Sequence, residues 1–88
     1  MKAIITVVGK DKAGIVAGVA TKIAELGLNI DDITQTILDE LYTMTSLVSS
    51  DPKKDFTHLR AELEAFGESL NVKINIQSSA IFDAMHNL

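Results

Sequence analysis

Residues 9–15, GKDKAGI, form the stretch whose residue types and spacing most directly indicate chemistry. Gly9 and Gly14 match the G-x-x-x-x-G that opens a nucleotide-binding P-loop, which continues with a lysine and a hydroxyl residue. Ile15 and Val16 stand at those two positions instead. Because the lysine for the phosphates and the hydroxyl for magnesium are both missing, the sequence argues against nucleotide hydrolysis.

The same loop retains the features of a site for a small anion. A glycine-rich turn at a helix start leaves backbone N–H groups unpaired, and the helix dipole adds partial positive charge there. Such an end binds a carboxylate as readily as a phosphate. Asp11 lies beside it in the sequence and can bind an ammonium group. A ligand with its carboxylate on the backbone N–H groups and its ammonium group on Asp11 would be an α-amino acid. The alternative, which the glycine pair taken alone favours, is a tight turn with Asp11 in solvent.

The other candidate residues form no catalytic or metal-binding set. Asp31 and Asp32 are adjacent at a strand start, where neighbouring side chains point to opposite faces, so we expect no acid–base pair. We predict instead that these two residues form an irregular, solvated start of the strand. His58 and His86 each lack a second histidine at helical spacing, which argues against a metal site. No cysteine is present and no spacing indicates a serine triad. We therefore expect no enzyme and no cofactor.

Composition narrows the classes of protein further. The chain has 88 residues, 47% of them hydrophobic and 23% charged, which is typical of one globular domain. A net charge of −4 with scattered basic residues argues against nucleic-acid binding. The first apolar run, AIITVV, is too short for a membrane span and lacks a cleavage site after it. We therefore expect no membrane partner and a cytoplasmic location.

The elements that must position the loop follow from hydrophobic periodicity. The first strand is apolar on both faces, so helices should cover one face and a second subunit or a terminal helix part of the other. The order of elements predicts an α+β ferredoxin-like βαββαβ sandwich, with a core at 1–77 and a short helical tail at 78–88. The predicted elements are a strand at 3–9, a helix at 14–26 stopped by Gly27, a strand at 29–38 with a bulge near Asp31 and Asp32, a turn at 39–40, a strand at 41–50, a helix from the capping Asp55 to Gly67, a strand at 70–77, and a tail carrying Ile81, Phe82, Met85 and Leu88.

Residues 7–35, VVGKDKAGIVAGVATKIAELGLNIDDITQ, resemble the first half of an ACT domain, and the later elements follow the order of that family. The chain is most similar to stand-alone bacterial ACT proteins, and also to ACT modules of glycine-cleavage repressors and formyltetrahydrofolate deformylases. The resemblance implies side-by-side pairing of two domains, with an amino acid between the first loop of one and the second strand of the other. Carried over by position, the loop side is Asp11, Ala13, Gly14 and Ile15, and the strand side is Asn29, Ile30 and Asp31.

The resemblance also implies a function. ACT modules are usually fused to an enzyme or a DNA-binding domain, and these 88 residues hold no such effector. We therefore expect a homodimeric, non-enzymatic module that binds a small amino acid and regulates a metabolic enzyme or regulator in trans. The alternative is a protein-interaction or dimerisation module that has no ligand.

Overall fold

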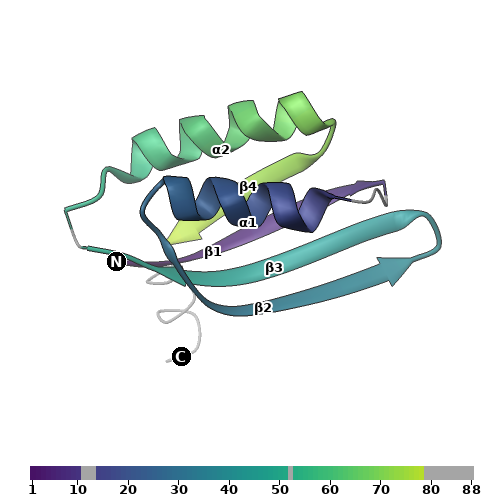
Figure 1. Ribbon diagram of the computed structural model, residues 1–88, viewed down its shortest axis with the longest axis horizontal. Coiled ribbons are helices and arrows are strands. Elements are labelled where there is room, and N and C mark those ends of the chain that lie inside the picture. Colours follow the sequence, from purple (N-terminus) through teal and green to yellow (C-terminus); the bar gives the residue numbers. More distant parts are fainter. Residues whose placement is uncertain (11–13, 52, 79–88) are drawn as a thin grey trace, which may run out of the picture.

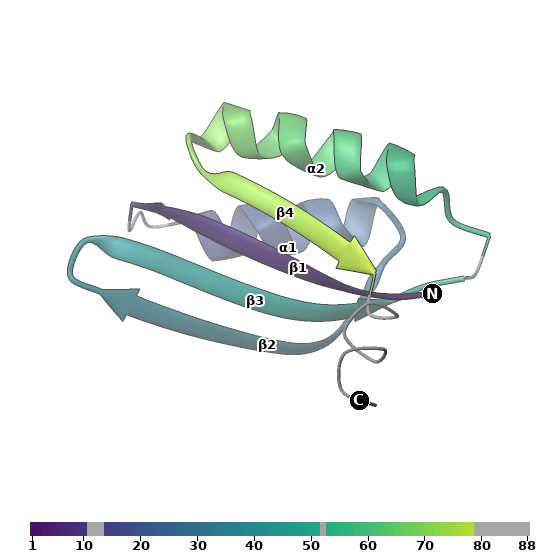
Figure 2. The ribbon, with the colours of Figure 1, turned by 180° about the vertical axis from the view of Figure 1, so that it is seen from behind.

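The computed structural model describes residues 1–10, 14–51 and 53–78. The elements are β1 (Lys2–Lys10), α1 (Ile15–Glu25), β2 (Asn29–Leu38), β3 (Leu41–Ser49), α2 (Phe56–Leu70) and β4 (Lys73–Ser78). The strands form one antiparallel sheet in the order β2-β3-β1-β4. Both helices lie on the same face of that sheet (Figure 1), and the opposite face carries neither of them (Figure 2). The predicted βαββαβ ferredoxin-like fold is confirmed, while the predicted terminal helix lies outside the described residues.

The core lies between the sheet and the helix layer. Ala3, Ile5 and Val7 of β1 are fully buried against the helices, while Ile4 and Val8 on the other face are only half-buried. In β4, Ile74 and Ile76 alternate with exposed polar residues, as predicted. The remaining buried apolar residues are Ile15, Val19, Ile23, Leu28, Tyr42, Met44, Val48, Leu59, Leu63 and Val72.

Local signals in the sequence explain how most of the elements begin and end. Gly27 ends α1 in the left-handed conformation, with φ of 78°, as predicted. The Asp55 carboxylate accepts hydrogen bonds from the backbone N–H groups of Thr57 at 3.0 Å and His58 at 3.4 Å, so the predicted cap of α2 is confirmed. The β2–β3 hairpin turns at residues 39–40, where Asp39 takes a left-handed φ of 58°. The ladder of that hairpin shifts register between Ile30 and Asp32, which confirms the predicted bulge.

The predicted end of the second helix at Gly67 is wrong. Helix α2 continues to Leu70 and ends at Asn71, whose φ is 61°. Gly67 is buried, and a Cβ placed on it would lie 2.8 Å from the Val72 carbonyl oxygen. The glycine is therefore needed for close approach of helix and chain, not for stopping the helix. Consequently β4 begins at Lys73, later than the predicted residue 70.

Candidate functional site

The first half of the candidate site is the start of α1. Gly14 precedes the helix with a φ of 92° and no capping side chain, and a Cβ built on it would meet no atom within 4 Å. Its carbonyl oxygen accepts the Gly18 N–H at 2.9 Å, so the helix starts in regular geometry. Within α1, which is described throughout, the first turn contains no acidic residue. The start of α1 therefore carries the positive end of a helix dipole, and among the described residues no side chain caps it.

The loop residues predicted for this half differ in what the structure says of them. Gly14 occupies the predicted position at the helix start. The Ile15 side chain is 4% exposed and belongs to the core, so only its backbone N–H can serve a ligand. Asp11 and Ala13 lie outside the described residues, and their predicted roles stay predictions.

The second half is the start of β2. The Asp31 carboxylate accepts hydrogen bonds from the Asn29 side-chain amide at 2.7 Å and from the Ser49 hydroxyl at 3.1 Å. Asn29 and Asp31 are exposed, and Ile30 is half-buried against the core. This Asn29–Asp31–Ser49 cluster holds an oriented carboxylate at the edge of the sheet. One amide donor and one hydroxyl donor share the same oxygen of Asp31, Oδ1, and both orient the carboxylate.

The bulge changes which way the two adjacent aspartates point. Asp32 pairs with Leu47, which alternates with buried Ser46 and Val48 and so lies on the face away from the helices. Asp31 bonds to Ser49, which lies on that same face. The prediction that Asp31 and Asp32 point to opposite faces is therefore wrong, because the extra residue breaks the alternation of the strand. Asp32 makes a separate local bond, accepting the Ile33 N–H at 2.8 Å.

Sequence reasoning did not single out Ser49. A signal existed: counting outward from the 39–40 turn, with one residue added for the bulge, pairs Ser49 with Asn29. The position of the extra residue has to be known before that pairing can be read from the sequence.

The two halves lie at opposite ends of the sheet in one chain. Asn29 pairs with Ser49, which pairs with Lys2 at the beginning of β1. Lys10, at the other end of β1, pairs with Leu41 beside the hairpin turn. Those ends are eight residue steps apart along β1, or about 26 Å at the usual rise. Gly14 follows Lys10 by four residues, so one small ligand cannot contact Gly14 and Asn29 of the same chain.

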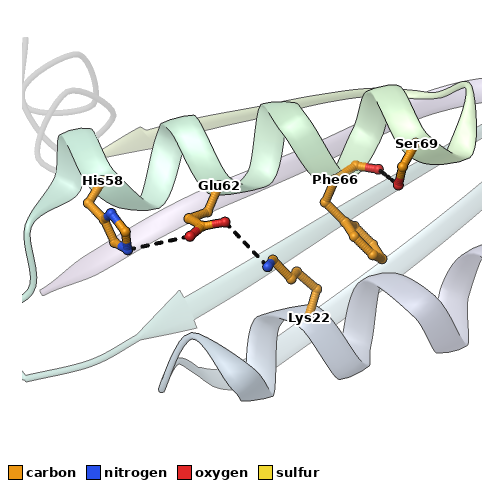
Figure 3. Close-up of polar contacts among 5 residues, drawn as sticks. All are labelled: Lys22, His58, Glu62, Phe66 and Ser69. Carbon is orange, nitrogen blue, oxygen red and sulfur yellow. Dashed lines mark hydrogen bonds and ion pairs between the residues drawn. The ribbon is translucent and has the colours of Figure 1, made fainter.

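A polar contact on the outer surface of the helices lies apart from both halves (Figure 3). The Lys22 ammonium of α1 donates a hydrogen bond to the Glu62 carboxylate of α2 at 3.4 Å and lies 5.8 Å from the Phe66 ring centroid. The other oxygen of Glu62 lies 3.7 Å from His58 Nε2. The Lys22 contacts join α1 to α2, whereas the contact between His58 and Glu62 lies within α2. In the part of the chain that the structure describes, no group of three or more His, Asp or Glu residues is placed to hold a metal ion.

Two surface hollows flank the sheet. One, of about 330 Å³, lies at the hairpin end and is lined by Lys10, Leu38, Asp39, Glu40 and Leu41. The other, of about 720 Å³, lies between α2 and β4, and its lining includes Glu64, Glu68 and Lys73. Neither of these two linings includes Gly14 or Asn29. The smaller hollow shares its end of the sheet with the start of α1.

None of the described helices is both long and apolar enough to cross a membrane.

Comparison with known proteins identifies the family to which this chain belongs. The family model for the ACT domain matches residues 2–77. The chain therefore belongs to the ACT domain family. ACT domains are in general regulatory modules that bind amino acids.

Individual relatives agree with this assignment. A UPF0237 protein of Streptococcus mutans is 80% identical over the whole of both chains. The solved structure of an ACT domain protein from Streptococcus pneumoniae is 78% identical, covers 93% of each chain and gives a TM-score of 0.88. The predicted similarity to stand-alone bacterial ACT proteins is thus confirmed, and the Streptococcus mutans relative is named as a UPF0237 protein.

Two more distant structures share the fold. A structure named for a glycine cleavage system transcriptional repressor is 25% identical with a TM-score of 0.76, over 86% of this chain and 44% of its own. A formyltetrahydrofolate deformylase from Burkholderia mallei is 20% identical with a TM-score of 0.78, over 90% of this chain and 28% of its own. The predicted similarity to both kinds of ACT module is confirmed at the level of the fold.

Proposed function

We propose that this chain is a non-enzymatic regulatory module that binds a small α-amino acid between two copies of itself. The observation that carries the proposal is the start of α1. It opens at a left-handed glycine without a capping side chain, whereas α2 is capped by Asp55. A carboxylate bonded to the first-turn N–H groups of α1 would act as a cap that no described side chain provides, and charged hydrogen bonds of this kind contribute about 1.5–3 kcal/mol each.

The separation of the two halves supports a site shared by two chains. Strand β2 is an edge of the sheet, and its residues from Ile33 to Leu38, ITQTIL, carry neither charge nor proline. The other edge, β4, carries Lys73, and the Arg60 guanidinium donates to its Ile76 carbonyl oxygen at 3.4 Å. Charged residues and covering side chains protect edges against pairing, so β2 is the edge suited to a second copy.

Antiparallel pairing of two β2 strands brings the two halves together. A two-fold axis at the middle of β2 places the start of one β2 beside the hairpin end of its partner. The hairpin end is where α1 begins, four residues after Lys10. The start of β2 in one protomer then lies near the α1 start of the other, with Ile30 on the helix-side face of the sheet and Asn29 on the opposite face. Asp11, which follows Lys10 in the sequence, is proposed to bind the ammonium group of the ligand.

The mechanism proposed for regulation is linkage. A ligand that bridges two protomers binds only the paired state and stabilises it, by about 2.7 kcal/mol at ~100 times its Kd. A metabolic enzyme or regulator that recognises one state is then controlled in trans. Regulation in trans is supported by the Streptococcus mutans relative, which this chain matches over that protein's whole length. A cytoplasmic location is proposed with it, supported by the absence of cysteine from the sequence.

A thermal-shift panel of the common amino acids at millimolar concentration tests the proposal. At least one of them is expected to raise Tm, and Gly14→Val is expected to abolish that rise because its side chain projects into the open space before α1. His58→Ala, on the outer surface of the helices, should keep the full shift. Asn71→Ala controls for backbone strain, since Asn71 also has a positive φ of 61° but lies at the end of α2. A panel with no shift at all would count against the proposal.

A second candidate function is a dimerisation or protein-interaction module without a ligand. It is favoured by the exposed apolar residues around the hairpin turn, where Ile37, Leu38 and Leu41 are 59%, 73% and 46% exposed. Apolar surface of this kind marks contact sites. Specific capture of a metabolic enzyme that is unaffected by every amino acid in the panel, and lost in Leu38→Ser, would support this function over the first.

A further inference from the structure

The sheet face away from the helices has an uncharged centre. Residues Ile4, Thr6 and Val8 of β1 lie on this face, each beside a residue of β3: Leu47, Thr45 and Thr43. Charged residues flank this centre instead of interrupting it, with Asp32 beside Leu47 on one side and Lys73 beside Val8 on the other. We call Ile4, Thr6, Val8, Thr43, Thr45 and Leu47 the open-face patch. A patch with three apolar residues and no charge is unusual for the solvated side of an antiparallel sheet, which normally carries polar residues at alternate positions.

The chain leaves the described structure at the border of this patch. Strand β4 ends at Ser78, which pairs with Ala3, and the preceding Gln77 pairs with Ile4. Ten residues follow, SAIFDAMHNL, with Ile81, Phe82, Met85 and Leu88 at the spacing of one helical face and Asp83, His86 and Asn87 between them. A helix of ten residues would be about 15 Å long. Neighbouring strands are about 5 Å apart, so such a helix would span β4, β1 and β3.

We propose that residues 79–88 cover the open-face patch of their own chain, with Phe82 and its apolar neighbours against Ile4 and Leu47. The segment starts on the strand next to β1, matches the patch in apolar character and is long enough to reach β3. Its charged and polar residues then face solvent. With this face occupied, a second copy cannot stack on it, and the β2 edge of the sheet remains open for pairing.

The absence of cysteine from the chain allows a direct test. Leu47→Cys and Phe82→Cys are introduced together, and the full-length protein is oxidised, denatured and separated without reductant. The expected product is a cross-linked monomer that has lost two hydrogens by mass. Glu64→Cys with Phe82→Cys is the matched control, because Glu64 lies on α2 in the opposite layer and should give no intrachain product.

The other occupants give different products and overturn the proposal. A tail exchanged between protomers gives a disulfide-linked dimer from the Leu47→Cys, Phe82→Cys double variant only. Two sheets stacked face to face give a dimer from Leu47→Cys alone. A patch left open gives neither product.

A second measurement in the full chain does not depend on disulfide geometry. Phe82→Ser should lower Tm by roughly 10 °C through loss of apolar burial, while Asp83→Ser, one residue along, should leave Tm nearly unchanged. The variant that combines Phe82→Ser with Leu47→Ser should lose less Tm than the sum of the losses in the two single variants, because both substitutions remove the same contact. Additive shifts, or no effect of Phe82→Ser, would overturn the proposal.

Discussion

Two glycines inside helices should respond oppositely to the same substitution. Gly18 lies within α1 and Gly67 within α2, so replacement by alanine gains the same helix propensity at both, about 1 kcal/mol. Their surroundings differ. A Cβ on Gly18 would lie 3.7 Å from Leu70 and Phe66 side-chain atoms, which is ordinary contact. A Cβ on Gly67 would lie 2.8 Å from the Val72 carbonyl oxygen and 3.0 Å from Ile74 Cγ1.

The difference between the two variants isolates the cost of the close approach. Gly18→Ala should raise the free energy of unfolding by about 1 kcal/mol, which corresponds to roughly 4–8 °C in Tm for a domain of this size. At Gly67 the obstructing atom is backbone, so α2 must move away from the start of β4. Overpacking of this kind costs about 1–3 kcal/mol. Gly67→Ala should therefore be about 1–3 kcal/mol less stable than Gly18→Ala.

Urea denaturation followed by circular dichroism measures both variants against the parent chain, with protein concentration held fixed because oligomerisation shifts apparent stability. Equal stabilisation of the two variants would refute the close approach of α2 to Val72.

Three further substitutions test other parts of the fold. Within the described residues, the buried Ser46 hydroxyl has no hydrogen-bond partner, so Ser46→Ala should raise the free energy of unfolding by about 1 kcal/mol in the same urea assay; a loss would show that the hydroxyl is paired in solution. Asp55→Ala should lower it by about 1 kcal/mol through loss of the α2 cap, whereas an unchanged midpoint would contradict that role. Arg60 donates to the Ile76 carbonyl oxygen and lies 5.0 Å from the Phe56 ring, so Arg60→Ala should expose the β4 edge and increase association by light scattering; a monodisperse variant identical to the parent would argue that the edge is protected otherwise.

Local chemistry explains why most elements could be predicted. The alternation in β4, the cap at Asp55 and the left-handed Gly27 each depend on residues a few positions apart. Gly67 could not be interpreted correctly, because its role depends on how closely Val72 approaches it in the folded chain. A glycine near a helix end supports both a C-cap and a close contact, and the sequence does not distinguish them.

The composition of the candidate site was predictable, but the side-chain contacts within its strand half were not. Gly14 could be placed at a helix start from its neighbours alone. The contact of Ser49 with Asp31 depends on the bulge and the hairpin register. The separation of Gly14 from Asn29 follows from the helix between them, which the periodicity of residues 14–26 predicted. That separation is what makes a second protomer necessary.

Mixing two defective variants tests the shared site most directly. Gly14→Val removes the loop half, and Asn29→Ala with Asp31→Ala removes the strand half; each variant alone should bind none of the amino acid that gives the largest thermal shift. Unfolded together and refolded as a mixture, they should recover about a quarter of the parental sites by titration calorimetry, because half of the dimers are mixed and each mixed dimer holds one intact site. No recovery in mixed dimers would contradict a site built from two protomers.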